Sequence, residues 1–162
     1  MVASSASLRL TVQRKAVELL APAGPTPQEL KRLSDIDDQD APWFHIPVIQ
    51  FYGTKASMVG RDPVAVVRDA VARALVYYYR IADRLRELEG LKLAVDCTGE
   101  GVLFIKADAN VSLEGLGGDA VQPPFLSLKE FLFDVPGSSK VLGTPLLLFQ
   151  VSFIYCHKEI FF

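Results

Sequence analysis

Short apolar runs along the chain follow the spacing of β-strands. Apolar and polar residues alternate over Leu8–Gln13, which predicts a strand with one buried face. Ile46–Tyr52 is rich in β-branched and aromatic residues and predicts a second strand, in which Pro47 favours an edge position or a strand start. Leu146–Tyr155 is almost continuously apolar and predicts a buried strand.

The longest periodic stretch has the spacing of a helix. Asp62 suits the N-cap, Pro63 the first turn and Gly90 a left-handed C-terminal cap, so the sequence predicts one helix over Pro63–Leu88. The apolar stripe of this helix comprises Val64, Val67, Val71, Leu75, Tyr78, Ile81, Leu85 and Leu88. The charges expected on its solvated face are Arg68, Asp69, Arg73, Asp83, Arg84, Arg86, Glu87 and Glu89.

Shorter patterns complete the predicted fold. Leu91–Asp96 and Val102–Ala107 are strand-like and are joined by a glycine-containing turn, which predicts a hairpin. Thr26–Glu29 and Ser127–Phe133 each begin with a capping-box pattern, which predicts a helical turn and a short helix. Strands mixed with helices indicate an α/β protein, here a two-layer α+β sandwich.

Composition and charge exclude several classes of protein. Half of the 162 residues are hydrophobic, so intrinsic disorder is excluded. The net charge of -2 offers no positive field for a polyanion, so no nucleic acid is expected as a partner. The most apolar window, Pro145–Cys156, is only about a dozen residues long and contains Gln150, which is too short to span a membrane.

The cysteines and the start of the chain indicate a cytoplasmic protein. Cys97 and Cys156 are the two cysteines, and their spacing suggests neither a disulfide framework nor a metal site. Residues 1–7 lack a basic region followed by an apolar stretch, so they do not resemble a secretory signal. A reducing compartment is therefore expected.

An acidic run and the two histidines are the candidates for chemistry. The aspartates at positions 35, 37, 38 and 40 invite a calcium loop, but Asp40 stands where that loop needs Gly and Ile46 where it needs Glu. A solvated loop is the favoured interpretation. His157 beside Cys156 lacks a second pair of zinc ligands, so no metal is expected.

His45 follows Trp43 and Phe44 in a segment that should run from a loop into a strand. Its imidazole would line a pocket or act as a base there, and the alternative is a packed or surface histidine. The chain completes no set of nucleophile, base and orienting acid, so no catalytic residue is assigned.

Four segments, in this order and spacing, resemble one protein family. The chain from Leu8 to Val151 is similar to the N-terminal part of the plant BAHD acyltransferases, especially alcohol acyltransferases of the benzyl alcohol O-benzoyltransferase type. The segments that carry the resemblance are Leu33–Asp37, Ala74–Leu85, Val95–Phe104 and Thr144–Val151.

The resemblance implies a fold and an activity. Members of this family are similar in fold to chloramphenicol acetyltransferase, with two α/β domains and an active site between them. They transfer an acyl group from a coenzyme A thioester to an alcohol or amine in plant secondary metabolism. A His-x-x-x-Asp motif supplies the general base. An Asp-Phe-Gly-Trp-Gly motif belongs to the second domain.

This chain departs from the family pattern in its motifs. It contains neither motif, and Phe161 stands four residues after His157. The expectation is an incomplete N-terminal domain that is inactive by itself and binds no cofactor, acyl-CoA being the co-substrate of the full-length family. The acceptor alcohol would then meet Trp43, Phe44 and His45.

Two further departures lie where the family has Tyr-Tyr-Pro-Ile-Ala-Gly-Arg-Leu. Arg80 replaces the proline and Asp83 replaces the glycine. Without the proline, the helix is expected to continue. An unpaired buried charge costs several kcal/mol, so Arg80 and Asp83 are expected to face water or each other.

The end of the chain suggests its origin. Residues 1–150 form the expected partial domain, and residues 151–162 a divergent tail. Val151-Ser152 is what translation through a splice donor would give, so the hypothesis is a truncated product with an intron-derived tail, and the alternative is a divergent C-terminal strand. The alternative function is a non-catalytic binding or interaction protein, whose exposed core surface favours self-association.

Overall fold

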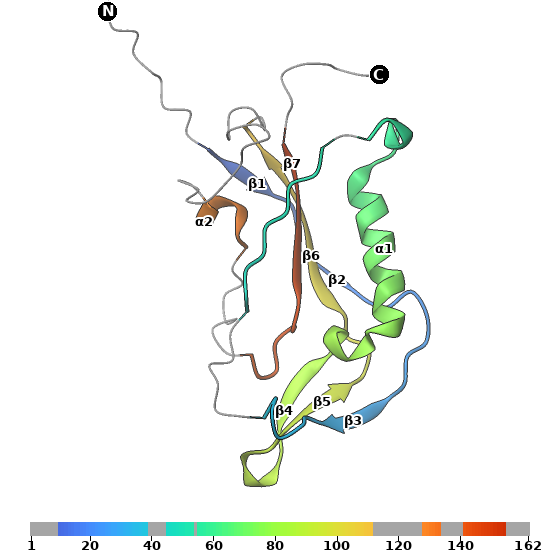
Figure 1. Ribbon diagram of the computed structural model, residues 1–162, viewed down its shortest axis with the longest axis vertical. Coiled ribbons are helices and arrows are strands. Elements are labelled where there is room, and N and C mark those ends of the chain that lie inside the picture. The colour runs from blue at the N-terminus through green and yellow to red at the C-terminus, as the bar shows by residue number, and fades with distance from the viewer. Residues whose placement is uncertain (1–9, 39–44, 54, 112–127, 134–140, 155–162) are drawn as a thin grey trace, which may run out of the picture.

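The computed structural model describes residues 10–38, 45–53, 55–111, 128–133 and 141–154. These residues form a four-stranded sheet and a three-stranded sheet, with one long helix packed against the larger sheet (Figure 1). This arrangement is the predicted mixture of helices and strands. Among the residues described, no helix is long and apolar enough to cross a membrane.

The four-stranded sheet is built around β6 (Val102–Ala109). One edge of β6 pairs antiparallel with two short strands in series, so that Val12 lies opposite Ala109 and Leu20 opposite Val102. The other edge pairs in parallel with a single strand along seven residues. The partners of β6 are β1 (Val12–Arg14), β2 (Glu18–Leu20) and β7 (Leu148–Ile154). The predicted strands at both ends of the chain are therefore confirmed within the part described.

The three-stranded sheet has the order β3-β5-β4, and all its pairs are antiparallel. Its strands are β3 (Glu29–Arg32), β4 (Arg84–Glu87) and β5 (Leu93–Cys97). Two predictions are wrong here. The run Thr26–Glu29 forms no helical turn and leads into β3, which begins at Glu29 and pairs with β5. The strands β5 and β6 exist, but they lie in different sheets and form no hairpin.

Helix α1 (Pro63–Tyr77) begins as predicted and ends earlier. Asp62 Oδ1 accepts a hydrogen bond of 2.9 Å from the Val64 amide, and Pro63 occupies the first turn. The helix ends where Tyr78 takes φ -108° and ψ 38°. The chain continues through η2 (Tyr79–Ala82) into β4, so the prediction of one helix to Leu88 is wrong. Pairing of β4 with β5 outweighs the local helical periodicity.

The apolar stripe of α1 covers one face of the four-stranded sheet. Val64, Ala72 and Leu75 pack with Leu20 and Phe104 in one buried cluster. The odd-numbered residues of β7 and its approach join this cluster, because alternate residues of a strand share a face. They are Leu147, Phe149, Val151 and Phe153. In Figure 1 α1 lies on one side of the sheet and α2 (Leu128–Phe131) on the other.

The opposite face of the sheet is fastened by Arg14. Its guanidinium donates hydrogen bonds of 2.7 Å to the carbonyl oxygens of Glu130 and Leu132, and one of 2.8 Å to Gln150 Oε1. Gln150 in turn donates to the carbonyl of Phe131. These bonds connect β1, β7 and the end of α2, where helix carbonyls lack partners of their own. The predicted helix Ser127–Phe133 is therefore confirmed over Leu128–Phe131, and Ser127 lies outside the described residues.

The segment Ile46–Tyr52 is not a strand, so this prediction is wrong. Its residues belong to no sheet, and the side chains of Ile46 and Tyr52 are 75% and 82% exposed. A strand needs a hydrogen-bonded neighbour as well as β propensity, and the described chain provides none for this segment. The remaining short elements are η1 (Ala56–Met58) and η3 (Glu89–Leu91), which holds Gly90 at φ 76° between β4 and β5.

We predict that Gly101→Ala lowers the free energy of unfolding by about 3 kcal/mol. Gly101 has φ +98°, and an added Cβ would lie 2.6 Å from the carbonyl oxygen of Leu20. Gly60 is the matched control, because it has φ +79° and open space around an added Cβ. Gly60→Ala should lower stability by about 1 kcal/mol. Equal losses in urea denaturation would contradict the close approach at Gly101.

Candidate functional site

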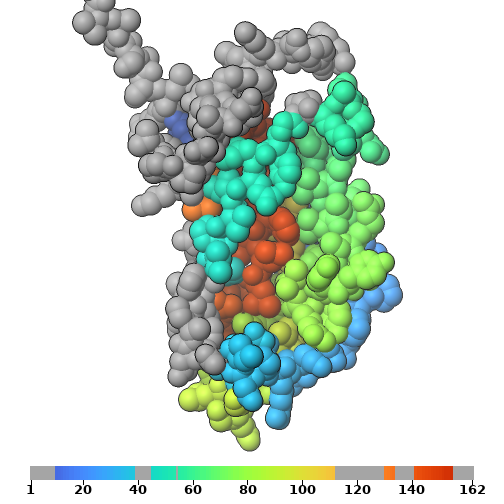
Figure 2. Space-filling model, in the orientation of Figure 1, coloured from blue at the N-terminus to red at the C-terminus, as the bar shows by residue number. Residues whose placement is uncertain are grey.

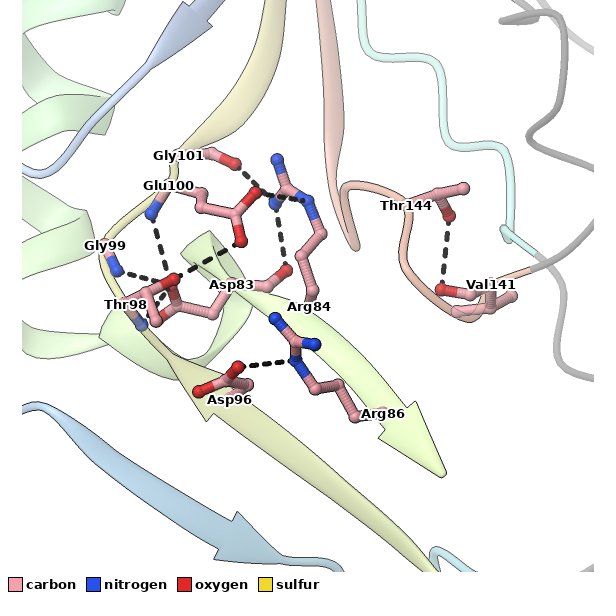
Figure 3. Close-up of polar contacts among 10 residues, drawn as sticks. All are labelled: Asp83, Arg84, Arg86, Asp96, Thr98, Gly99, Glu100, Gly101, Val141 and Thr144. Atoms are coloured by element: carbon pink, nitrogen blue, oxygen red, sulfur yellow. Dashed lines mark hydrogen bonds and ion pairs between the residues drawn. The ribbon is translucent and has the colours of Figure 1, made fainter. Parts of the chain in front are cut away.

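Two charged residues are buried where the two sheets meet (Figure 3). Asp83 is 0% and Arg84 6% exposed, although the sequence predicts both on a solvated helix face. That prediction is wrong because the helix ends before them and β4 carries Arg84 into the sheet. Arg80 is half-exposed, as predicted, and lies 3.7 Å from Glu29. Asp83 is buried and bonds to the turn after β5, so the prediction that it faces water or Arg80 is wrong for this residue.

The turn after β5 encloses the carboxylate of Asp83. Asp83 Oδ1 accepts hydrogen bonds from the backbone amides of Thr98, Gly99 and Glu100 at 3.0, 2.6 and 3.3 Å. Successive amides that point at one anion form a nest, and they compensate for the loss of hydration. Gly99 has φ 76°, which allows the turn to present its amides in this way. Asp83 Oδ2 is buried without a partner among the atoms described.

Arg84 holds the other side of the same turn. Its Nη1 donates hydrogen bonds of 3.0 Å to the carbonyl of Asp83 and 2.9 Å to that of Gly101. Its Nε lies 3.3 Å from Glu100 Oε2. Figure 3 shows these contacts converging on the turn from the start of β4, with the ion pair of Arg86 and Asp96 beside them.

This polar cluster stabilises the fold. Its hydrogen bonds show no arrangement for proton transfer. The Asp83 oxygen that is hydrogen-bonded is committed to amides, and Arg84 to carbonyls. Cys97 lies close by on β5, and its pKa is raised by burial and then by the negative charge of Asp83. A raised pKa keeps the thiol protonated at neutral pH, which makes Cys97 a poor nucleophile. Cys156 lies outside the described residues.

The aspartates of the acidic run differ in their exposure to solvent. Asp38 accepts hydrogen bonds from the Leu93 amide at 2.9 Å and from Lys92 Nζ at 2.8 Å, and its side chain is 4% exposed. The Asp35 side chain is 99% exposed. A solvated loop is therefore the correct description of Asp35 and the wrong one for Asp38. Within the described ranges, no group of three or more candidate ligands could hold a metal ion, and Asp40 lies outside those ranges.

His45 is the one predicted pocket residue that the structure describes. It is half-buried, and its Nε2 lies 3.0 Å from the carbonyl oxygen of Pro145, just before β7. A carbonyl oxygen only accepts hydrogen bonds, so Nε2 carries a proton in this contact, and in the neutral imidazole Nδ1 is then an acceptor. Trp43 and Phe44 lie outside the described residues. The contact accounts for a packed histidine and also places an imidazole at the entry to β7.

Sequence reasoning missed the Asp83 cluster because its members are far apart in the chain. Asp83 and its amide donors are separated by 15 to 17 residues. The one local signal was the turn Thr98-Gly99-Glu100-Gly101, whose two glycines both take positive φ. The amides of such a turn bind an anion, but only the fold shows which anion occupies them.

The sequence and the fold both match known proteins. The sequence model of the Transferase family matches residues 9–157. The chain is 56% identical over 157 residues to a benzyl alcohol O-benzoyltransferase of Nicotiana tabacum, covering 97% of this chain and 34% of the relative. It is 57% identical over 159 residues to a (Z)-3-hexen-1-ol acetyltransferase of Arabidopsis thaliana, covering 98% of this chain and 35% of the relative.

A solved structure supports the fold. Vinorine synthase aligns with a TM-score of 0.53 at 20% identity, over 90% of this chain and 35% of that one. This likeness confirms the predicted α/β fold. The chain spans about a third of the length of the curated relatives it matches. The predicted boundary after Gln150 falls inside β7, and the family match continues to residue 157, while the origin of residues 151–162 stays a prediction.

We predict that Asp83→Ala lowers the free energy of unfolding by about 3 kcal/mol, because it leaves buried amides without an acceptor. Asp83→Asn is the matched variant, since it keeps an oxygen for the amides and removes the charge. It should lower stability by about 1 kcal/mol. Chemical denaturation measures both values. If Asp83→Ala kept wild-type stability, the bonds from the three amides to Asp83 would not stabilise the fold.

We also predict a pH dependence at Asp38. The hydrogen bond from Lys92, followed by that from the Leu93 amide, lowers the pKa of Asp38 below its ordinary value of 3.8. The stabilisation is therefore complete above that ordinary value and is lost as the pH falls through the lowered pKa. Asp38→Asn should be less stable than wild type at pH 7 and converge with it in strong acid. Asp35→Asn is the exposed control, whose carboxylate lies 3.5 Å from the same Lys92, and it should stay close to wild-type stability at pH 7.

Proposed function

The chain belongs to the Transferase family, and we propose that it is the N-terminal part of an acyl-CoA-dependent O-acyltransferase. The reaction moves an acyl group from a coenzyme A thioester to the hydroxyl oxygen of an alcohol and releases the free thiol of coenzyme A. The chain's own contribution is the framework of one domain and one side of the acceptor site.

One observation carries the proposal. Identity stays at 56% and 57%, over nearly the whole chain, to enzymes named for acyl transfer to benzyl alcohol and to (Z)-3-hexen-1-ol. Both acceptors are primary alcohols attached to an apolar group. We therefore propose a primary alcohol of that kind as the acceptor.

The proposal includes inactivity of this chain by itself. Acyl transfer needs a base that takes the hydroxyl proton as the oxygen attacks the thioester. The resemblance to the BAHD acyltransferases implies a His-x-x-x-Asp motif for that role. His45 is followed four residues later by Ile49, and His157 by Phe161, so neither histidine forms the motif.

The acceptor side of the site is proposed at Trp43, Phe44 and His45. His45 supports this placement, because it lies at the entry to β7 with Nδ1 able to accept a hydrogen bond from a hydroxyl group. Two adjacent aromatic side chains suit an alcohol with an apolar body.

A chimera tests the proposal. Residues 1–150 are joined to the part of the N. tabacum relative that follows its residue aligned with Gln150, so that β7 is completed, and transfer from benzoyl-CoA to benzyl alcohol is measured. We expect the chimera to be active within about two orders of magnitude of the parent relative, which corresponds to about 3 kcal/mol of misfit. This chain alone should show no transfer above the uncatalysed rate. A folded but inactive chimera would overturn the acyltransferase proposal. Activity of this chain alone would overturn the proposed inactivity.

The chimera also tests the acceptor residues. His45→Ala and Phe44→Ala should raise KM for benzyl alcohol by about tenfold with kcat unchanged, because they remove binding that is equal in the ground and transition states. Ile36→Ala, at a side chain that is 79% exposed, is the control and should change neither constant. An unchanged KM in His45→Ala would contradict a role in acceptor binding and leave His45 a structural role through its contact with Pro145.

A further inference from the structure

The turn after β5 binds a carboxylate through its backbone. Figure 3 shows the side chain of Asp83 pointing into this turn, where the amides of Thr98, Gly99 and Glu100 donate to Oδ1. Arg84 donates to backbone carbonyls rather than to the carboxylate. Among the atoms described, Asp83 Oδ2 has no hydrogen-bond partner. Within this set of atoms, the three amides are therefore what compensates the buried charge.

Bonds that leave out the Asp83 side chain also hold the turn. The Gly101 amide donates to the carbonyl of Ala82 at 2.7 Å, and the Gly101 carbonyl accepts from Arg84 Nη1 at 2.9 Å. Gly101 also lies against the backbone of Leu20. The amides that point at Asp83 are therefore preorganised, and a preorganised site binds a ligand at a lower ordering cost.

The segment that carries Asp83 is fixed in a similar way. Tyr79 Oη in η2 donates to Glu29 Oε1 at 2.9 Å, and Figure 2 shows blue β3 lying against the green end of the helical region. Position 83 has φ -125° and ψ -160°, an extended conformation that any residue adopts. A shorter side chain at this position should therefore leave the path of the chain unchanged.

Asp83 has the properties of a ligand that is covalently attached to its own site. Its side chain is fully buried, and the amides would bind a carboxylate in the same way whatever molecule carries it. Attachment to the chain raises the effective concentration of the carboxylate at the amides. A free anion of the same shape should therefore bind the same amides more weakly. Asp83 replaces the glycine of the family pattern, so the attached carboxylate is a feature of this chain.

We propose that the backbone amides of Thr98, Gly99 and Glu100 form a binding site for a small carboxylate anion, and that Asp83 is its built-in ligand. A chain without this side chain takes up a free monocarboxylate, such as formate, in its place. An anion that binds the folded chain and not the unfolded chain stabilises the fold by mass action. This proposal does not rest on the acyltransferase proposal.

Two variants of different size test the fit of the anion in urea denaturation of the whole chain. Asp83→Ala keeps Cβ and makes room for formate, whereas Asp83→Gly also makes room for the methyl group of acetate. We expect the folding equilibrium constant of Asp83→Ala to rise about sixfold in about 0.5 M formate, which corresponds to a dissociation constant of about 0.1 M. In acetate it should rise less than about twofold, because the methyl group meets Cβ.

Asp83→Gly should respond to acetate at least as strongly as to formate, because the methyl group then fills the space of the removed Cβ. The same response to both anions in Asp83→Ala would overturn the proposed fit. The absence of any gain in formate would overturn the site itself.

Asp83→Asn is the matched control, because it keeps an oxygen for the amides and needs no free anion. It should gain no more from formate than wild type does. Each protein is also measured in sodium chloride at the same concentration, since salts change the strength of apolar burial in general. Equal gains in Asp83→Asn and Asp83→Ala would show a general salt effect and overturn the proposal.

Nuclear magnetic resonance locates the anion. In Asp83→Ala the amide resonances of Thr98, Gly99 and Glu100 should shift with formate concentration and reach saturation. The amide of Gly90, which precedes β5 at its other end, should not shift. Folded Asp83→Ala whose three amides do not shift would overturn the proposal.

The test stays decisive if Asp83→Ala does not fold in plain buffer. Folding that appears only with formate, while Asp83→Asn folds without it, would support the proposal in its strongest form. Asp83→Ala that stays unfolded up to about 1 M formate, under conditions in which Asp83→Asn folds, would overturn it.

Discussion

The turn at residues 98–101 is the point on which the relation of the two sheets depends. The chain leaves β5 in one sheet, turns, and enters β6 in the other. The Gly101 amide donates to the carbonyl of Ala82 at 2.7 Å, and the Asp83 carboxylate accepts from the turn. Gly101 also lies against the backbone of Leu20. Because buried backbone groups must be satisfied, these contacts fix the turn between the sheets and the end of the helical region.

From this turn the larger sheet acquires two different faces. Residues of β6 and β7 alternate, so one set packs under the apolar stripe of α1 and the other faces α2. The second face is held by polar bonds from Arg14, which satisfies carbonyls at the end of α2 and reaches Gln150 across the sheet. The face under α1 contributes most of the burial, and on the opposite face the bonds from Arg14 hold α2 beside a smaller apolar cluster that includes Phe131.

The residue proposed for the acceptor site lies away from the buried charged cluster. The buried charges at Asp83 and Arg84 are occupied by backbone partners, so they hold the sheets together and leave proton transfer to other groups. His45 sits instead at the entry to β7, on a carbonyl that belongs to the connection between the sheets. The chain spans about a third of the length of the relatives it matches.

The sequence by itself determined the local elements: the capped start of α1 at Asp62, the strands β5, β6 and β7, and the family resemblance. Caps and periodicity act over a few residues and can be read directly. Only the tertiary structure decided that α1 stops at Tyr77, that β5 and β6 part into different sheets, and that Asp83 is buried. The reason is that strand pairing and satisfaction of buried polar groups join residues far apart in the chain, whose partners no local pattern specifies.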